Sequence, residues 1–232
     1  MYQFNIVFGI LVAFLSNYFL EGLGGDNDWR WMLGVMAVPS IIYTLMVMSI
    51  PESPRWLIAR KNDIANAKKV LMKLGVVNPD EVISSVTTSI QHESSAGHTS
   101  GFFSSKYKSI VWLAFMIAFF NQLSGINFIL YYAPEILERA GLAAKESLFN
   151  SIAIGGTNLV FTFVGLYLID KAGRKTLLII GSLGYILSLS LVAWAFYSHA
   201  SPGFLLIFLL LFIAAHAIGQ GAVIWVFISE IF

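Results

Sequence analysis

Six apolar segments, each about as long as a bilayer is thick, limit the folds that this sequence can adopt. A helix needs about 20 apolar residues to cross the hydrocarbon core. The segments cover residues 4–20, 31–50, 110–133, 147–169, 176–197 and 204–228. Only helices and closed barrels satisfy their backbone groups in lipid, and none of the segments alternates with a period of two. The sequence therefore predicts an all-α polytopic membrane protein with six transmembrane helices.

The composition is that of a protein embedded in a lipid bilayer. Of 232 residues, 57% are hydrophobic and 12% are charged, whereas a soluble domain carries about 25% charged residues. Cysteine is absent, which excludes disulfides and thiolate metal sites. No cleavable signal pattern precedes residues 4–20, and we expect no separate leader. A net charge of +1 without a basic, aromatic patch does not favour nucleic acid, and no nucleophile, base and metal set favours an enzyme, a cofactor or a metal site.

The distribution of Lys and Arg predicts the orientation of the chain. Eight of them fall in residues 51–109 and three in residues 170–175, against three on the other connections. Cytoplasmic loops carry the excess of basic residues. The sequence thus predicts a multi-pass protein of the inner (plasma) membrane, with residues 51–109 and 170–175 cytoplasmic and with residues 21–30, 134–146 and 198–203 external.

The cytoplasmic segment 51–109 reads as a helical linker. Residues 54–74 have the spacing of a short amphipathic helix, residues 80–91 fit a second one, and the Ser- and Gly-rich run at 94–101 is typical of a flexible connection. The segment holds no nucleotide loop and no metal-spaced His set. Two interpretations stay open, a helical bridge between two membrane halves and a simple solvated connector.

The third apolar segment carries polar side chains in unusual number. They are Asn121, Gln122, Asn127, Tyr131 and Tyr132. Hydrocarbon offers no water, so each must find a partner in protein, in a cavity or on a ligand. Neutral amides offer donors and acceptors together, as sugar hydroxyls do. Contact between transmembrane helices is the alternative, but five such side chains within about a dozen residues favour a polyol ligand.

Helix geometry leaves several of these residues ambiguous. On an unbroken helix Gln122 points about 80° away from the arc of its polar neighbours. Gly125 offers a place to unwind, as discontinuous helices do near transporter sites; otherwise Gln122 bonds a neighbouring helix. In the fourth segment a small polar face is either a cavity wall or a tight helix contact. This face consists of Ser151, Gly155, Asn158 and Thr162.

The sixth segment holds two further candidates. His216 and Trp225 lie on opposite faces unless residues 219–221 bend the helix. His216 is either a proton carrier or a neutral side chain bonded to a neighbour. Trp225 can lie flat on the apolar face of a pyranose, or it can be an ordinary residue of the membrane interface.

Four runs of residues give the sequence a family resemblance. The runs are Pro51–Leu57, Gln122–Glu135, Asp170–Lys175 and Trp225–Phe232, in that order and spacing. Together they strongly resemble the sugar porter family of the major facilitator superfamily. The resemblance implies that the chain is a partial major facilitator fold, matching helices five to ten of a twelve-helix transporter. Residues 1–50 would be the last two helices of the N-terminal half, 51–109 the cytoplasmic linker, and 110–232 the first four helices of the C-terminal half.

The resemblance also implies a function. The intact protein would move a monosaccharide across the bilayer by alternating access, either as a symporter with protons as the coupling ion or as a facilitator. The fragment itself would not be transport-competent. The alternative is a non-transporting helical assembly module whose polar faces serve only helix contacts.

The residues at the positions of the family's sugar contacts are predicted to bind substrate. They are Gln3, Asn121, Gln122, Asn127, Tyr131, Asn158 and Trp225. Asn121 departs from the pattern, because many members have Gln there. A second set is predicted to form a cytoplasmic gate of charge pairs, namely Glu52, Arg55, Asp170, Arg174 and Glu230. The alternative role for such charges is to anchor the orientation in the membrane, which we favour for Lys171 and Lys175.

Overall fold

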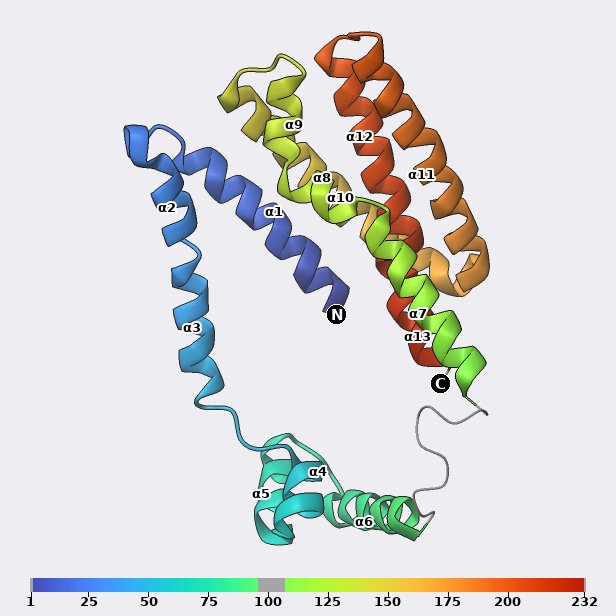
Figure 1. The fold of residues 1–232 in the computed structure, drawn as a ribbon. Helices are drawn as coiled ribbons and strands as arrows, with labels where there is room; N and C mark the ends of the chain where they lie inside the picture. The colour runs from blue at the N-terminus through green and yellow to red at the C-terminus, as the bar shows by residue number, and fades with distance from the viewer. Residues whose placement is uncertain (1, 96–106, 232) are drawn as a thin grey trace. The chain divides into compact units, whose positions relative to one another are not determined.

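The computed structural model describes residues 2–95 and 107–231, and within these ranges all regular structure is helical (Figure 1). The described chain divides into two compact units. One unit, here the membrane unit, contains the chain up to Val35 and from Lys108 onward, and the other, the linker unit, runs from Met36 to Tyr107. Each unit is described by itself. The predicted domain boundaries at residues 50 and 109 stay predictions.

The predicted helical membrane architecture is confirmed. Six helical segments in the described ranges are long and apolar enough to cross a bilayer. They are Gln3–Leu20, Gly25–Val47, Lys108–Tyr131, Ala144–Ala172, Arg174–Tyr197 and Pro202–Glu230. Each overlaps one of the six predicted segments and begins one to six residues before it.

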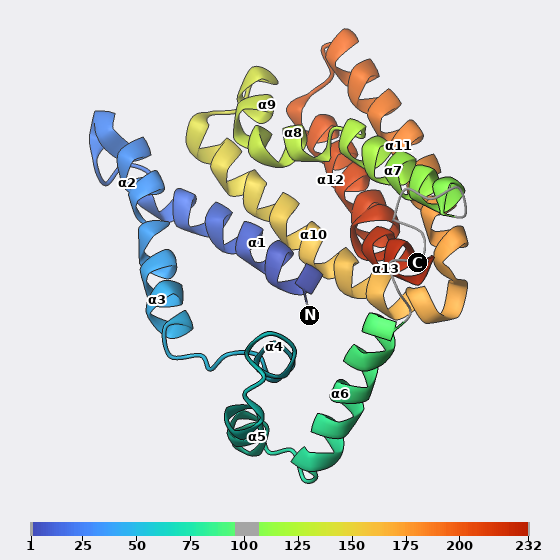
Figure 2. The same ribbon diagram turned by 60° about the horizontal axis from the view of Figure 1, so that its bottom comes forward.

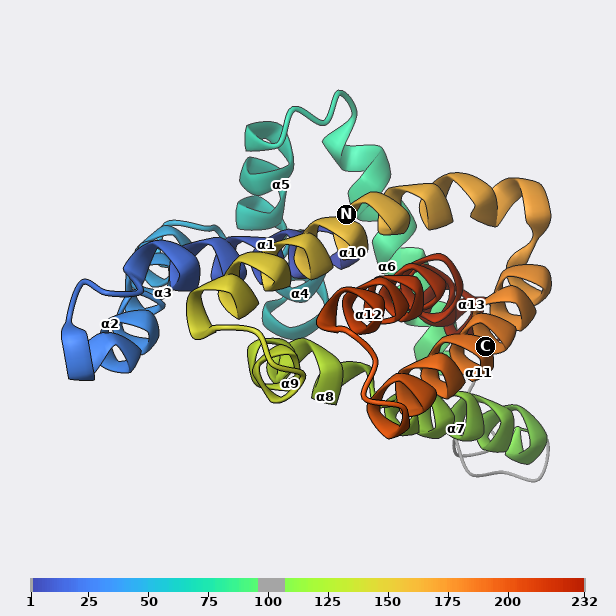
Figure 3. The ribbon, with the colours of Figure 1, turned by 90° about the horizontal axis from the view of Figure 1, so that it is seen from above.

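The membrane unit is built from straight and broken helices. Its N-terminal part consists of α1 (Tyr2–Leu20), the short turn η1 (Gly25–Asn27) and α2 (Asp28–Gly34). The part after the linker consists of α7 (Lys108–Leu123), α8 (Ile126–Tyr131), α9 (Ala133–Arg139), α10 (Ala144–Ala172), α11 (Arg174–Tyr197), α12 (Pro202–His216), η3 (Ala217–Gly221) and α13 (Ala222–Glu230). Figures 2 and 3 show α10 between α1 and α12, with α11 on the far side of α12.

Glycines let these helices approach closely. Inside a membrane no hydrophobic effect drives helices together, and close packing at small residues holds them instead. A Cβ atom added to Gly155 of α10 would lie 2.9 Å from the Phe14 ring of α1. A Cβ atom added to Gly181 of α11 would lie 2.8 Å from the Cα of Gly219 in η3. Backbone therefore meets backbone where α11 crosses the end of α12.

Two helix irregularities occur at places that the sequence left open as alternatives. Gly125, with φ of +82°, separates α7 from α8, a backbone conformation that glycine adopts without steric cost. Residues Ala217–Gly221 form a π-helical turn between α12 and α13. Such turns hold one residue more than an α-turn and are frequent at functional sites.

The linker unit consists of α3 (Ala37–Val47), α4 (Pro54–Trp56), the π-turn η2 (Leu57–Lys61), α5 (Ile64–Lys73) and α6 (Pro79–Ser95). The predicted single helix over 54–74 is wrong in its continuity, because Asn62 takes a left-handed conformation with φ of +53°. Asn tolerates that conformation better than most residues. Asp63 then caps α5 by accepting a hydrogen bond from the Asn66 N–H at 3.0 Å.

A small apolar core holds the linker helices together. Its buried members are Leu57, Ile58, Ala67, Leu71 and Ile83. An ion pair of 2.7 Å joins Lys68 of α5 to Asp80 of α6. The second predicted helix is confirmed and longer than expected, and residues 94 and 95 of the predicted flexible run belong to α6. The rest of that run lies outside the described residues.

Candidate functional site

The break between α7 and α8 brings together two side chains that are predicted to bind sugar. The Nδ2 of Asn127 donates a hydrogen bond to the Oε1 of Gln122 at 2.8 Å. On a regular helix residues five apart point about 140° away from each other, so the pair depends on the left-handed Gly125 between them. Both side chains are exposed. Tyr131, one turn further along α8, is 77% exposed.

This amide pair keeps unused hydrogen-bonding capacity. After their mutual bond, the Gln122 amide nitrogen still has donors and the Asn127 carbonyl oxygen can still accept. A ligand with hydroxyl groups can therefore bind to the pair without breaking it. The sequence left open whether Gln122 bonds a neighbouring helix. In the structure its hydrogen-bond partner is Asn127, which belongs to the same membrane-crossing segment.

Asn121 lies in a different environment from its neighbour Gln122. It is only 8% exposed, and its Oδ1 is buried without a hydrogen-bond partner among the described residues. Its backbone carbonyl accepts a hydrogen bond from the Ser124 hydroxyl at 2.6 Å. A buried amide oxygen without a partner costs free energy. It is the kind of group that a substrate hydroxyl or a bound water would satisfy.

The small polar face of α10 is packed rather than open. Asn158 is 3% exposed, and Ser151, Gly155 and Thr162 are buried with it. Leu11 and Phe14 of α1 cover this face at Gly155. Of the two alternatives, the tight helix contact is the one that the structure contains. Gln3 lies in the first turn of the same α1 and is partly buried.

The two candidate residues of the last membrane-crossing segment, His216 and Trp225, lie in different surroundings. Trp225 on α13 is 52% exposed, whereas His216 at the end of α12 is buried. The Nδ1 of His216 shares a hydrogen bond with the hydroxyl of Tyr185 from α11, and the two rings stack with centroids 5.9 Å apart. His216 thus has the bonded neighbour that the second interpretation of this residue expects.

Three of the predicted gate residues meet at one end of the membrane unit. Arg174, the first residue of α11, places Nη2 2.7 Å from the Oε1 of Glu230 and Nη1 3.5 Å from the Oδ1 of Asp170. Nη1 also donates to the carbonyl of Ile169 at 3.3 Å. The guanidinium therefore joins the ends of α10, α11 and α13. Glu52 and Arg55 belong to the linker unit, so their part in a gate stays a prediction.

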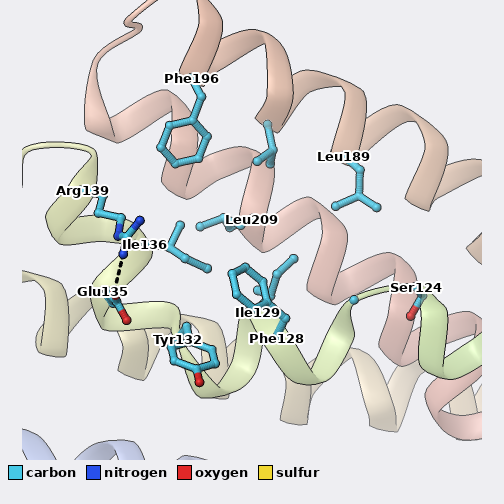
Figure 4. Close-up of a pocket in the computed structure, with 12 residues that line it drawn as sticks. Ser124, Phe128, Ile129, Tyr132, Glu135, Ile136, Arg139, Leu189, Phe196 and Leu209 are labelled. Carbon is cyan, nitrogen blue, oxygen red and sulfur yellow. Dashed lines mark hydrogen bonds and ion pairs between the residues drawn. The ribbon is translucent and has the colours of Figure 1, made fainter.

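The membrane unit contains a cavity that begins at the break between α7 and α8 and continues along α8 and α9. It has a volume of about 560 Å³ and is bordered by α8 and α9 on one side and by α11 and α12 on the other (Figure 4). Most of its lining is apolar, including Phe128, Ile136, Leu189 and Leu209. Asn127 and Tyr131 do not line it. Asn127 and the cavity thus occupy different faces of α8.

Sequence reasoning missed this cavity and the ion pair at its edge. Arg139 lies 2.7 Å from Glu135 in α9, and both residues line the cavity. Their spacing of four residues could have indicated the pair. The cavity could not be foreseen, because the residues of its far wall lie 50 or more positions further along the chain. In the described part of the chain no group of three or more His, Cys, Asp or Glu residues is placed to hold a metal ion.

Comparisons with known proteins agree on one class of relatives. The family model described as "Sugar (and other) transporter" matches residues 1–232. The D-xylose-proton symporter of Escherichia coli K12 is 33% identical over 236 residues, which are 99% of this chain and 47% of that protein. The arabinose-proton symporter of Bacillus subtilis 168 is 33% identical and matches 100% of this chain and 51% of that protein.

A solved structure supports the same assignment. The partially occluded inward-open conformation of the xylose transporter XylE from E. coli superposes with a TM-score of 0.83 at 31% identity. The match covers 99% of this chain and 49% of that one. Another matched structure of XylE is described as a proton:xylose symporter of the major facilitator superfamily. The chain spans about half the length of the relatives that it matches.

Proposed function

The chain belongs to the sugar transporter family of the major facilitator superfamily, and on that premise we propose that its six helices form part of a monosaccharide transporter that works by alternating access. In such transporters two helical halves rock about a site near the bilayer midplane. Several relatives are named as proton symporters for xylose, arabinose and galactose. We therefore propose protons as the coupling ion, with facilitated diffusion as the alternative.

The observation that carries the proposal is the exposed amide pair of Gln122 and Asn127. A contrast within the same unit supports a ligand role. Gln220 donates to the hydroxyl of Ser182 on another helix at 3.2 Å, which is what an amide does when it joins helices. Gln122 and Asn127 bond each other and face outward, so their remaining donors and acceptors are available to sugar hydroxyls.

The proposed site extends to the other residues at the positions of the family's contacts. Gln3, Asn121, Asn158, Tyr131 and Trp225 would complete it. Gln3 is partly buried on α1, and Asn158 is buried on the packed face of α10. Among the five, Asn121 has a buried oxygen without a hydrogen-bond partner in the described part of the chain. Trp225 and Tyr131 have exposed rings that can lie against a pyranose. The gate proposed at the cytoplasmic end consists of Arg174 with Asp170 and Glu230, together with Glu52 and Arg55.

The test is sugar binding by a transporter that contains these helices. In the chimera, residues 1–232 replace the matching half of the E. coli D-xylose-proton symporter, and purified protein is titrated with radiolabelled xylose and glucose. Gln122→Ala and Asn127→Ala should each weaken binding at least tenfold, because a site built for hydroxyl groups leaves polar atoms unpaired. Gln220→Ala is the matched control, and it should lower thermal stability without changing the dissociation constant.

The competing assembly-module hypothesis predicts the opposite pattern. If Gln122 and Asn127 only join helices, their loss should destabilise the chimera as Gln220→Ala does, with sugar affinity unchanged. Sugar-driven alkalinisation of the medium by vesicles would separate proton symport from facilitated diffusion.

The 232-residue chain by itself should insert into membranes without transporting sugar. A pathway needs walls from both halves, and the polar face of α8 would meet lipid or a second copy. Uptake of labelled glucose, xylose, galactose and arabinose into vesicles holding the purified chain measures this. Stereoselective, competable uptake would require a smaller transport unit, such as a dimer of two six-helix chains.

A further inference from the structure

The linker unit concentrates positive charge at one place. Six basic residues and one acidic residue occur between Pro54 and Lys73, a local net charge of +5 in a chain whose total is +1. The basic residues are Arg55, Arg60, Lys61, Lys68, Lys69 and Lys73. The general excess of Lys and Arg on cytoplasmic loops accounts for the sign of this charge, but not for its place on the folded helices.

On α5 the basic residues share one face with an apolar side chain. Ala65, Lys69, Met72 and Lys73 fall within an arc of about 100°, and all four are exposed. The opposite face, with Ala67 and Leu71, is buried in the linker core. Lys68 is engaged with Asp80. Lys69 and Lys73 are therefore the lysines of α5 that project from the folded unit together with Met72.

Large apolar side chains extend this surface beyond α5. Leu74 is 64% exposed and Val77 is 90% exposed, and both follow the helix directly. Trp56 is partly exposed, and the Lys61 ammonium lies 4.5 Å from the centroid of its ring. Exposed aliphatic side chains beside lysines are typical of segments that lie in the interface of a membrane. Indole rings with a neighbouring cation are common there too.

The covalent connection keeps this surface close to the bilayer. The apolar helix α3 ends at Val47 and α4 begins at Pro54. Seven residues span at most about 25 Å when fully extended. The basic segment therefore starts within a short distance of the end of a membrane-crossing segment, whatever angle the linker unit adopts.

From these observations we propose that the surface formed by Lys69, Met72, Lys73, Leu74 and Val77 binds anionic phospholipids of the adjacent leaflet. The ammonium groups bind lipid phosphates, and the aliphatic side chains enter the boundary between headgroups and acyl chains. Clusters of four to eight basic residues next to a transmembrane helix bind acidic lipids in this way. Docking on lipid would restrict the motion of the linker and add a lipid-dependent contribution to the equilibrium between transporter conformations.

Because the chain has no cysteine of its own, a single introduced cysteine can carry a spin label that tests the proposal. A spin label is attached to Leu74→Cys in the full chain, which is placed in nanodiscs of phosphatidylcholine with or without 30% phosphatidylglycerol. We expect the label to gain oxygen accessibility and lose nickel-chelate accessibility only in discs that contain phosphatidylglycerol. The effect should fade in 0.5 M salt, since salt screens charges at this distance. A label on Ser84→Cys of α6, an exposed polar position, should report water in every disc.

Charge variants separate lipid recognition from simple proximity. Lys69→Gln with Lys73→Gln should lower the ratio of docked to water-exposed linker roughly 30-fold, from the effect expected of two lysines at an acidic surface. Lys145→Gln, which removes a lysine on the other side of the membrane, should leave it unchanged. Two outcomes overturn the proposal. In one, the label on Leu74→Cys stays in water in all discs; in the other, it is shielded in both lipids and insensitive to salt, which would mean that protein covers the surface.

Discussion

Replacing Gly181 by alanine should force two membrane helices apart. In the structure a Cβ atom at this position would lie 2.8 Å from the Cα of Gly219 and 3.1 Å from the carbonyl oxygen of Ala215. Both obstacles are backbone atoms, so no side-chain rotation can relieve the clash. Normal contact would require α11 and the α12–η3 segment to separate by about 1 Å.

The size of the effect follows from the contacts that such a separation weakens. If about 40 atom pairs at roughly 0.15 kcal/mol each lose a third of their attraction, the cost is about 2 kcal/mol. Alanine regains about 1 kcal/mol, because it is a better helix former than glycine. Gly181→Ala should therefore destabilise the unit by about 1 kcal/mol. Gly156→Ala on α10 has open space around the new methyl group and should stabilise by up to about 1 kcal/mol.

The assay is reversible unfolding of the purified chain from mild micelles into dodecyl sulfate, followed by tryptophan fluorescence. The prediction concerns the difference of about 2 kcal/mol between the two variants. Equal free energies of unfolding for Gly156→Ala and Gly181→Ala would refute the close approach of α11 and η3. The same would follow if Gly181→Leu were tolerated.

Three further predictions concern other parts of the chain. Asn121→Gln in the chimera should change relative uptake rates among hexoses and pentoses more than it changes stability; identical uptake profiles would count against a role at the site. Removing Arg174 and Glu230 singly and together should give a coupling energy of about 0.5 kcal/mol, because the pair is partly exposed, and no coupling in that double-mutant cycle would show that it is incidental. The hydrogen bond from the Asn66 N–H lowers the pKa of Asp63 from its ordinary value. The stabilisation of α5 by the Asp63 cap should thus be fully present well above that ordinary pKa and be lost as the pH falls through the lowered pKa. Asp63→Asn keeps the cap and should remove this pH dependence from the hydrogen exchange of α5, and an unchanged acid response would contradict the assignment.

The fold was largely predictable because lipid leaves few choices. Length and hydropathy identified the six crossing segments. The misfit of Gln122 on a regular helix left a break at Gly125 as one of two alternatives, and the structure contains that break. The contact between Gln122 and Asn127 was not predictable, since it depends on the φ angle of the single residue Gly125. Small residues on a membrane-spanning helix are also compatible with two structures, a tight helix contact and the wall of a cavity.

Other features needed partners that are distant in sequence. Tyr185 lies 31 positions from His216, and no local pattern connects them. The face around Asn158 was ambiguous because small polar residues suit a cavity wall and a helix contact equally; Leu11 and Phe14 decide between them. The left-handed Asn62 was missed although Lys61-Asn62-Asp63 contains a residue type that favours such turns.

The π-turn at Ala217–Gly221 makes one stretch of the chain tolerant of a particular genetic change. Because the turn holds one residue more than an α-turn, deleting one of its residues would let the helix close into regular geometry while α13 keeps its direction. Trp225 would stay on its side of α13 and Glu230 would stay beside Arg174. The same deletion in the regular helix α12 would instead rotate everything beyond it by about 100° and shift it by about 1.5 Å. A deletion scan across α12 and α13 should therefore show that in-frame losses of single codons are better tolerated inside the π-turn than on either side of it.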